Sequence, residues 1–328
     1  MSSRRFDVLA MGDAIVDVIA TCDDGFLLAH GLPKGSMQLL STEQADKLYN
    51  AMGSARETSG GSAANTMAGV AAMGGRAAFV GQVASDQLGA IFAHDMRALG
   101  VTFETPALAN GHPTGRCLIL VTPDAQRTMN TCPGAAHQLA PAALDEAAIR
   151  DAAILYLEGY LFGPELPRSA MHRAVGIARK AGNQVAFTLS ESVCLPGRKE
   201  GLQAMIAEGG IDLIFANEAE VQQLTGRGDL DGAIAEITSQ VPTLVVTRGE
   251  HGALAVERGE RTDVPAIAVQ KVVDTTGAGD LFAAGFLTAR AMGHGIDRQL
   301  MTGAIAAAEV IGHFGARPMS DLKQLVKL

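Results

Sequence analysis

Residues 273–280 have the sequence VDTTGAGD and precede an apolar stretch of helix-forming residues, 281–292. This pattern predicts a glycine-rich turn that opens a helix. The small residues Gly277, Ala278 and Gly279 let their backbone N–H groups approach an anion, and the helix dipole adds partial positive charge there. Asp280 is then expected in the first helical turn. It would serve either as a capping carboxylate or as a base beside a bound phosphoryl group.

The chain before this turn alternates between short apolar segments and helical ones. Apolar segments at 154–157, 185–189, 213–216 and 243–247 are interleaved with helical patterns at 167–181, 202–208 and 218–224. Such alternation is typical of an α/β fold with a mostly parallel sheet and helices on both faces. Ligands of these sheets bind at the carboxyl ends of the strands, so a site is expected in the loops there.

The N-terminal part is less regular. A buried strand is predicted over residues 6–11, ending at Gly12, and a second strand over 14–21. Ser41 and Gln44 have the spacing of a capping box, which predicts a helix running to about Ala55. Four prolines divide residues 101–133 into short strand-like pieces.

Composition excludes several classes of protein. The chain has 328 residues, 48% of them hydrophobic, and a net charge of −9, which disfavours binding to nucleic acid. Its cysteines form no CxxC pair, which disfavours a zinc ribbon; they are Cys22, Cys117, Cys132 and Cys194. No apolar run reaches the ~18 residues of a membrane span, and Asp7 and Asp13 interrupt any signal-peptide pattern. We therefore expect a cytoplasmic protein without membrane or nucleic-acid partners. The P-loop pattern GxxxxGK[ST] is also missing.

Several segments together resemble the ribokinase-like (PfkB-type) small-molecule kinases. Residues 274–280 are similar to the second signature of that family, and residues 80–89 to the first. The other matches are residues 12–17, 60–65, 217–220 and 247–249, so the resemblance extends from residue 12 to about 318. It implies one ribokinase-like kinase domain over residues 1–328. A small β lid is then expected from about residues 14–40 and 105–133, inserted in the main α/β domain.

Within that family the resemblance is greatest to adenosine kinases. Residues 113–117, PTGRC, and 156–162, YLEGYLF, are similar to segments of those enzymes. One difference is that adenosine kinases usually have Asn where Asp13 stands. Both side chains accept hydrogen bonds, but only Asn donates one, so the pattern of substrate hydroxyls is open.

The resemblance implies roles on the substrate side. Asp17 would bind a vicinal diol, because a carboxylate accepts from two adjacent hydroxyls. Asp13 would bind substrate or orient Asp17, Gly60 and Gly61 would form a hinge, and Asn65 would contact substrate from the next helix. Side chains expected to line an apolar slot for a base are Met37, Met129, Tyr160 and Phe162, with ordinary core packing as the alternative.

The resemblance implies further roles on the nucleotide side. ATP would contact Asn217, Thr247, Arg248, Gly249 and Thr276, and the lid residue Arg127 would approach the phosphates unless it is simply solvated. Asn217 and Glu220 would hold hydrated Mg²⁺, or they would only cap a surface helix. A possible monovalent cation, K⁺, is expected at Asp274, Thr276 and Gly315.

The function implied is ATP-dependent phosphorylation of a primary hydroxyl, most simply adenosine to AMP. Asp280 would be the base, and residues 277–279 would stabilise the phosphoryl group. The alternatives are a sugar kinase of ribokinase, fructokinase or 2-keto-3-deoxygluconate kinase type, in which Arg116 or Arg127 would pair with a substrate carboxylate, and a non-catalytic nucleoside sensor. A monomer and a homodimer formed through the lid are both compatible with the sequence.

Overall fold

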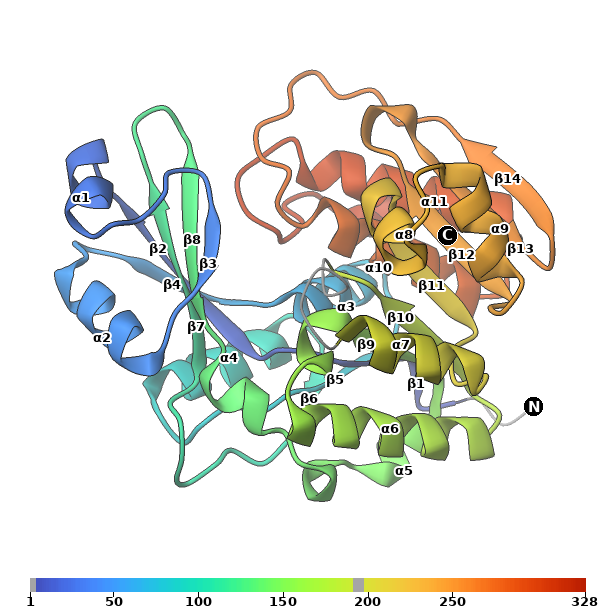
Figure 1. The fold of residues 1–328 in the computed structure, drawn as a ribbon, viewed down its shortest axis with the longest axis horizontal. Helices are drawn as coiled ribbons and strands as arrows, with labels where there is room; N and C mark the ends of the chain where they lie inside the picture. Colours follow the sequence, from blue (N-terminus) through green and yellow to red (C-terminus); the bar gives the residue numbers. More distant parts are fainter. Residues whose placement is uncertain (1–3, 191–197) are drawn as a thin grey trace.

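A computed structural model describes residues 4–190 and 198–328, which leaves Cys194 outside the described residues. In this part of the chain, nine strands form a sheet in the order β14-β13-β12-β11-β10-β9-β1-β5-β6 (Figure 1). Their bounds are β1 Phe6–Met11, β5 Ala77–Val80, β6 Thr102–Phe103, β9 Ala152–Glu158, β10 Gln184–Thr188, β11 Leu213–Asn217, β12 Thr243–Thr247, β13 Ala253–Glu257 and β14 Glu260–Val264. Neighbouring strands from β6 to β12 are parallel, and β13 and β14 are antiparallel.

Successive side chains of each strand point to opposite faces of this large sheet. Both faces carry apolar side chains, and helices cover both. One core joins Val8, Ala10 and Tyr156 to the helices α3 Ser62–Ala72, α4 Gln87–Ala98, α10 Ala278–Ala291, α11 Ile296–Val310 and α12 Leu322–Val326. The second joins Leu9 and Met11 to α5 Glu146–Arg150, α6 Glu165–Lys180, α7 Arg198–Ala207, α8 Glu218–Thr225 and α9 Leu230–Thr238. The predicted α/β class is confirmed.

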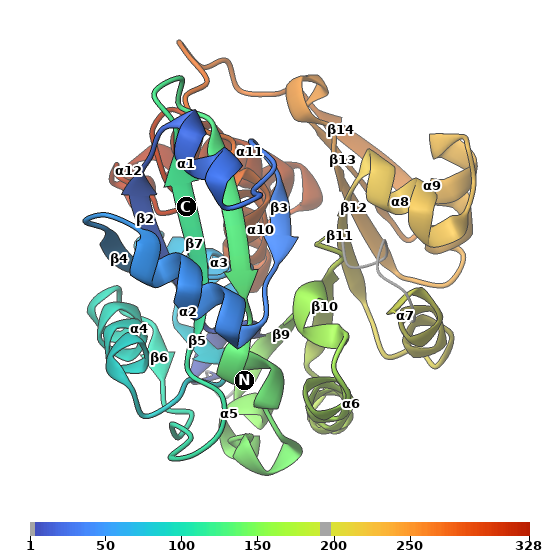
Figure 2. The same ribbon diagram turned by 60° about the vertical axis from the view of Figure 1, so that its left-hand side comes forward.

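A smaller sheet stands beside the large one (Figures 1 and 2). Its order is β3-β8-β7-β2-β4, with β2 Ile15–Thr21, β3 Met37–Leu39, β4 Arg56–Gly60, β7 Gly115–Val121 and β8 Arg127–Cys132. The helices α1 Asp24–Ala29 and α2 Thr42–Ala51 cover its face turned away from α10 and α11 (Figure 1). Four of these strands come from the two segments expected to form a lid.

The fifth strand, β4, was missed. The capping box of Ser41 and Gln44 is present as predicted, but the helix ends at Ala51 rather than near Ala55. Residues 56–60 instead pair antiparallel with β2. This long-range pairing overrides the local helical pattern.

None of the described helices is long and apolar enough to cross a membrane.

Candidate active site

The predicted turn at residues 274–280 lies at the start of α10, as expected. Gly277 has φ 81°, and a Cβ on it would lie 2.7 Å from the Cβ of Ala316. Only glycine meets both constraints without strain. No side chain caps this end of α10, and of its first N–H groups that of Ala278 donates to the carbonyl oxygen of Thr275 at 3.2 Å.

Asp280 is held by two side chains of α3. Its carboxylate accepts hydrogen bonds from Ser62 Oγ at 2.6 Å and Asn65 Nδ2 at 2.9 Å. Burial raises the pKa of Asp280, and these two bonds and the charge of Arg317 offset only part of that rise. A fixed carboxylate with a raised pKa is suited to accepting a proton from a substrate hydroxyl.

Asp17 lies on β2, on the side of the small sheet that faces Asp280. Burial raises its pKa to about 6, although the charges of Arg317 and Arg127 oppose the rise. A Cβ on Gly60 would lie 2.5 Å from the Asp17 carboxylate, and one on Gly61, where φ is 93°, would lie 2.3 Å from the carbonyl oxygen of Asp13. The glycine pair thus permits the close approach of β4 to both acidic residues.

Asp13 forms a buried acidic pair with Glu158. The fully buried Glu158 accepts the backbone N–H of Asp13 at 3.2 Å and that of Ala63 at 2.6 Å. Burial and the neighbouring Asp13 raise the pKa of Glu158 well above its ordinary value. His137 Nε2 lies 3.8 Å from Asp13 Oδ1, an atom with no hydrogen-bond partner among the described residues. Asp13 therefore directs an acceptor into this region.

Arg127 reaches from the small sheet to the turn before α10. Its Nη1 lies 2.9 Å from Asp274 Oδ2 and 3.4 Å from Thr276 Oγ1, and its guanidinium lies over the ring of Phe314. Burial opposes ionisation of Asp274, but hydrogen bonds from Gly315 and Thr276 and the Arg127 charge hold its pKa below the ordinary value. Arg127 is therefore bound at this turn and is not simply solvated, and its approach to the phosphates stays a prediction.

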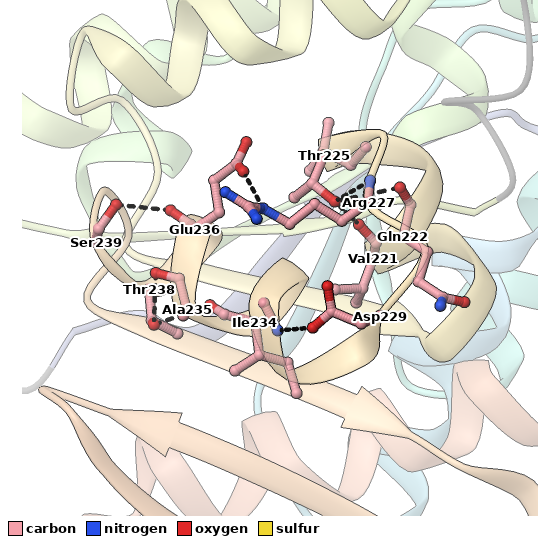
Figure 3. Close-up of polar contacts among 12 residues, drawn as sticks. Val221, Gln222, Thr225, Arg227, Asp229, Ile234, Ala235, Glu236, Thr238 and Ser239 are labelled. Carbon is pink, nitrogen blue, oxygen red and sulfur yellow. Dashed lines mark hydrogen bonds and ion pairs between the residues drawn. The ribbon is translucent and has the colours of Figure 1, made fainter.

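Four of the residues expected on the nucleotide side lie at the carboxyl ends of β11 and β12 or directly after them: Asn217, which pairs with Thr247, and Arg248 and Gly249. Asn217 and Glu220 form a capping box on α8, so the capping alternative holds whether or not they also bind a metal. Arg248 pairs with Glu218 at 3.0 Å, and Gly249 follows it with φ 55°. Figure 3 shows the next part of the chain, α8 and α9, where Arg227 pairs with Glu236 and Asp229 caps α9.

The expected apolar slot is only partly assembled. Met129 lies on β8, half-buried, and is paired in register with Met37, which is 45% exposed. Tyr160 and Phe162 belong to a short 3-10 turn after β9. Phe162 is a correction, because its ring is buried in the second core against Phe187 and belongs to the packing that was its alternative.

Comparison with known proteins agrees with this geometry. Residues 36–323 match the pfkB family carbohydrate kinases. The chain belongs to this family. The crystal structure of adenosine kinase from Sinorhizobium meliloti is 43% identical, has a TM-score of 0.91, and covers 98% of this chain and 99% of that one. The 5-dehydro-2-deoxygluconokinase of Halalkalibacterium halodurans is 27% identical over 100% of this chain and 95% of the relative. Fructokinase-1 of Oryza sativa subsp. japonica is 32% identical over 70% of this chain and 72% of the relative.

This pfkB kinase is therefore an enzyme that phosphorylates a hydroxyl group of a small molecule, and membership supports ATP as the donor. The residues predicted for K⁺ do come together, and a cation bound at them stays a prediction. Both oxygens of Asp274 already accept hydrogen bonds, from Thr276 and from Gly315, and Arg127 neutralises its charge. We derive no step through a monovalent cation.

Three functional candidates escaped prediction from the sequence: Ser62, Glu158 and Arg317. Ser62 and Glu158 lie inside segments that resemble family motifs, but their roles depend on contacts with Asp280 and Asp13, which are distant in sequence. Arg317 follows the last predicted helix, and no local pattern marks it.

Substitution of Gly277 tests the backbone constraint at the turn before α10. Gly277→Ala should cost about 1–2 kcal/mol of stability from the left-handed backbone, and the contact with Ala316 should add to this. Gly279→Ala is the matched control for stability, because a Cβ there meets nothing within 4 Å. Thermal unfolding checks both, and equal melting temperatures for the two variants would contradict the assigned constraint.

Proposed function

We propose that this kinase transfers the γ-phosphoryl group of ATP to the primary hydroxyl of a nucleoside, with adenosine converted to AMP. The observation that carries this proposal is the chemistry of the small-sheet face around Asp17. The β2–β7 register sets Asp17 beside Cys117 and Ile19 beside Ile119, and Ile119 pairs with Met129 of β8. A diol-binding carboxylate bordered by apolar side chains suits a ribose joined to a flat apolar base.

The pairing of two arginines argues against a keto acid bound at either of them. A keto acid would need a cation for its carboxylate, and Arg116 and Arg127 are the two arginines expected to supply it. Arg116 donates to Asp46 and Arg127 pairs with Asp274, so both guanidinium groups are already engaged by carboxylates of the chain. The relationship to the Sinorhizobium meliloti adenosine kinase adds support.

In the proposed reaction, Asp280 accepts the proton of the primary hydroxyl while that oxygen bonds to the γ-phosphorus. The bond from this phosphorus to the bridging oxygen breaks, and ADP leaves. The N–H groups of residues 277–279 stabilise charge on the transferring oxygens. The small sheet would act as a lid that excludes water, so that ATP is not hydrolysed.

Asn217 and Glu220 would hold hydrated Mg²⁺ near the phosphates. Glu220 is 7% exposed and accepts the backbone N–H of Asn217, which pairs with Thr247 at the strand end. A carboxylate with intervening waters suits this ion. When bound, Mg²⁺ would neutralise charge on the phosphate oxygens.

A sugar kinase is the second candidate, because the curated relatives above are a fructokinase and a 5-dehydro-2-deoxygluconokinase. The two can be separated by ADP release with Mg-ATP and a panel of acceptors. The panel is adenosine, inosine, guanosine, cytidine, ribose, fructose, 2-keto-3-deoxygluconate and 5-dehydro-2-deoxygluconate. We expect the highest kcat/KM with adenosine. Preference for a free sugar would overturn the nucleoside assignment and leave the kinase assignment intact.

A further inference from the structure

Arg317 joins three elements of the site. It follows Gly315, whose N–H binds Asp274, and Ala316, which packs under Gly277. From there its side chain crosses to the junction of β4 and α3. Its Nη1 donates to the carbonyl oxygen of Ala64 at 2.7 Å, and its Nη2 donates to the carbonyl oxygen and Oγ of Ser59 at 3.1 and 3.2 Å.

These contacts lie on both sides of the glycine pair Gly60–Gly61. Ser59 lies on β4 and pairs with Val16, the residue before Asp17 on the neighbouring strand β2. Ala64 lies between Ser62 and Asn65, the two residues that bind the Asp280 carboxylate. One guanidinium group therefore fixes the last residue before the glycine pair and the first turn after it.

Arg317 is also a buried positive charge next to the two acidic groups. Burial lowers its own pKa to about 10, so it stays protonated at neutral pH. Its charge favours the ionised forms of both Asp17 and Asp280. The groups near these two carboxylates and Arg317 include the donors Ser62 and Asn65 from α3. The titratable and charged groups are Tyr156 and Glu158 from β9, Cys117 from β7, Arg127 from β8, Asp95 from α4 and Arg317 itself.

We propose that Arg317 is a positioning residue for phosphoryl transfer: it fixes the junction of β4 and α3 so that Ser62 and Asn65 hold Asp280 in place, and it brings a buried positive charge to that carboxylate. This inference rests on the proposed function only in taking Asp280 as the base. It does not depend on whether the acceptor is a nucleoside or a sugar. Lys retains the charge but lacks the planar fork that reaches both carbonyls, so the two actions can be separated.

The test compares Arg317→Met and Arg317→Lys with the wild-type chain over a range of pH. For Arg317→Met we expect kcat on the alkaline plateau to fall at least about tenfold, and the acid limb of the kcat profile to move to higher pH. For Arg317→Lys we expect a similar fall in plateau kcat with the acid limb near its wild-type position. KM for ATP should change little in either variant.

Arg298→Met is the matched control. Arg298 also donates to two backbone carbonyls, those of Val326 and Lys327, but it lies at the opposite end of α11 from the site. Its kcat and acid limb should equal those of the wild type. Melting temperatures of all variants show whether a fall in kcat comes from unfolding or from misplacement of Asp280. If the Met variant does not fold, the Lys variant still tests the proposal.

The proposal is overturned if Arg317→Lys keeps wild-type kcat, or if a folded Arg317→Met variant keeps the wild-type acid limb. The same measurement is made on whichever acceptor the wild-type chain phosphorylates. Turnover of a sugar alone would overturn the nucleoside assignment and still test Arg317. A folded wild-type chain that phosphorylates neither class would overturn both proposals.

Discussion

Asp280→Asn is expected to lower kcat by about 10²- to 10⁴-fold, the usual contribution of a general base. The amide keeps the size of the carboxylate and can still accept a hydrogen bond from Ser62, but it cannot take the hydroxyl proton. KM for ATP and for the acceptor should stay within a few-fold of wild type. Steady-state kinetics with the best acceptor of the panel, and calorimetric binding of that acceptor, measure the two quantities separately.

Asp297→Asn is the control for this variant. Asp297 occupies the first turn of α11 as Asp280 occupies that of α10, but it is exposed. Its kcat should match the wild type. Near-normal turnover by a folded Asp280→Asn variant would show that another group removes the proton.

Asp17→Asn should raise KM for a nucleoside by about 10- to 100-fold, since a hydrogen bond to a charged group contributes roughly 1.5–3 kcal/mol. The effect should depend on pH in a defined direction. Because burial raises the pKa of Asp17 to about 6, the carboxylate is ionised above that pH and protonated below it. Wild-type KM should therefore rise as the pH falls through about 6, whereas KM of the Asn variant should be flat across this range.

The pH dependence of KM for wild type, Asp17→Asn and Asp24→Asn tests this expectation. Asp24 lies on α1 of the same small sheet, with its side chain 70% exposed and paired with Lys34, so its variant should follow the wild type. A wild-type KM that does not change between pH 5 and 7 would show that Asp17 is not the carboxylate that binds the diol.

Local patterns predicted much of the fold. The capping boxes at Ser41 and Asn217 are both present, because such caps depend only on residues three positions apart. The alternation of apolar and helical segments likewise gave the parallel sheet, since each strand buries both faces. The predicted end of α2 was wrong because the following segment, β4, pairs with β2, a contact between residues about forty positions apart.

The site divides in the same way. The turn at Gly277, with its N–H groups and with Asp280 in the first turn of the helix, follows from eight consecutive residues and is visible in them. The partners of those residues are not. Asp280 is bound by Ser62 and Asn65, more than two hundred positions earlier, and the charge of Arg317, from the chain after α11, acts on it. Arg127 reaches from β8 to Asp274 of the turn.

The difference has a physical cause. Turn conformation and helix capping are settled by steric and hydrogen-bond terms within a few residues, so the amino-acid order specifies them directly. The environment of a carboxylate depends on which charges and donors the packed chain brings within several ångströms. Burial then strengthens those interactions, and it sets the pKa of Asp17 at about 6. It also decides that Phe162 fills the core while Met129 stays half-buried beside Ile119 on the small sheet. Such assignments arise only when the two sheets and their helices have packed.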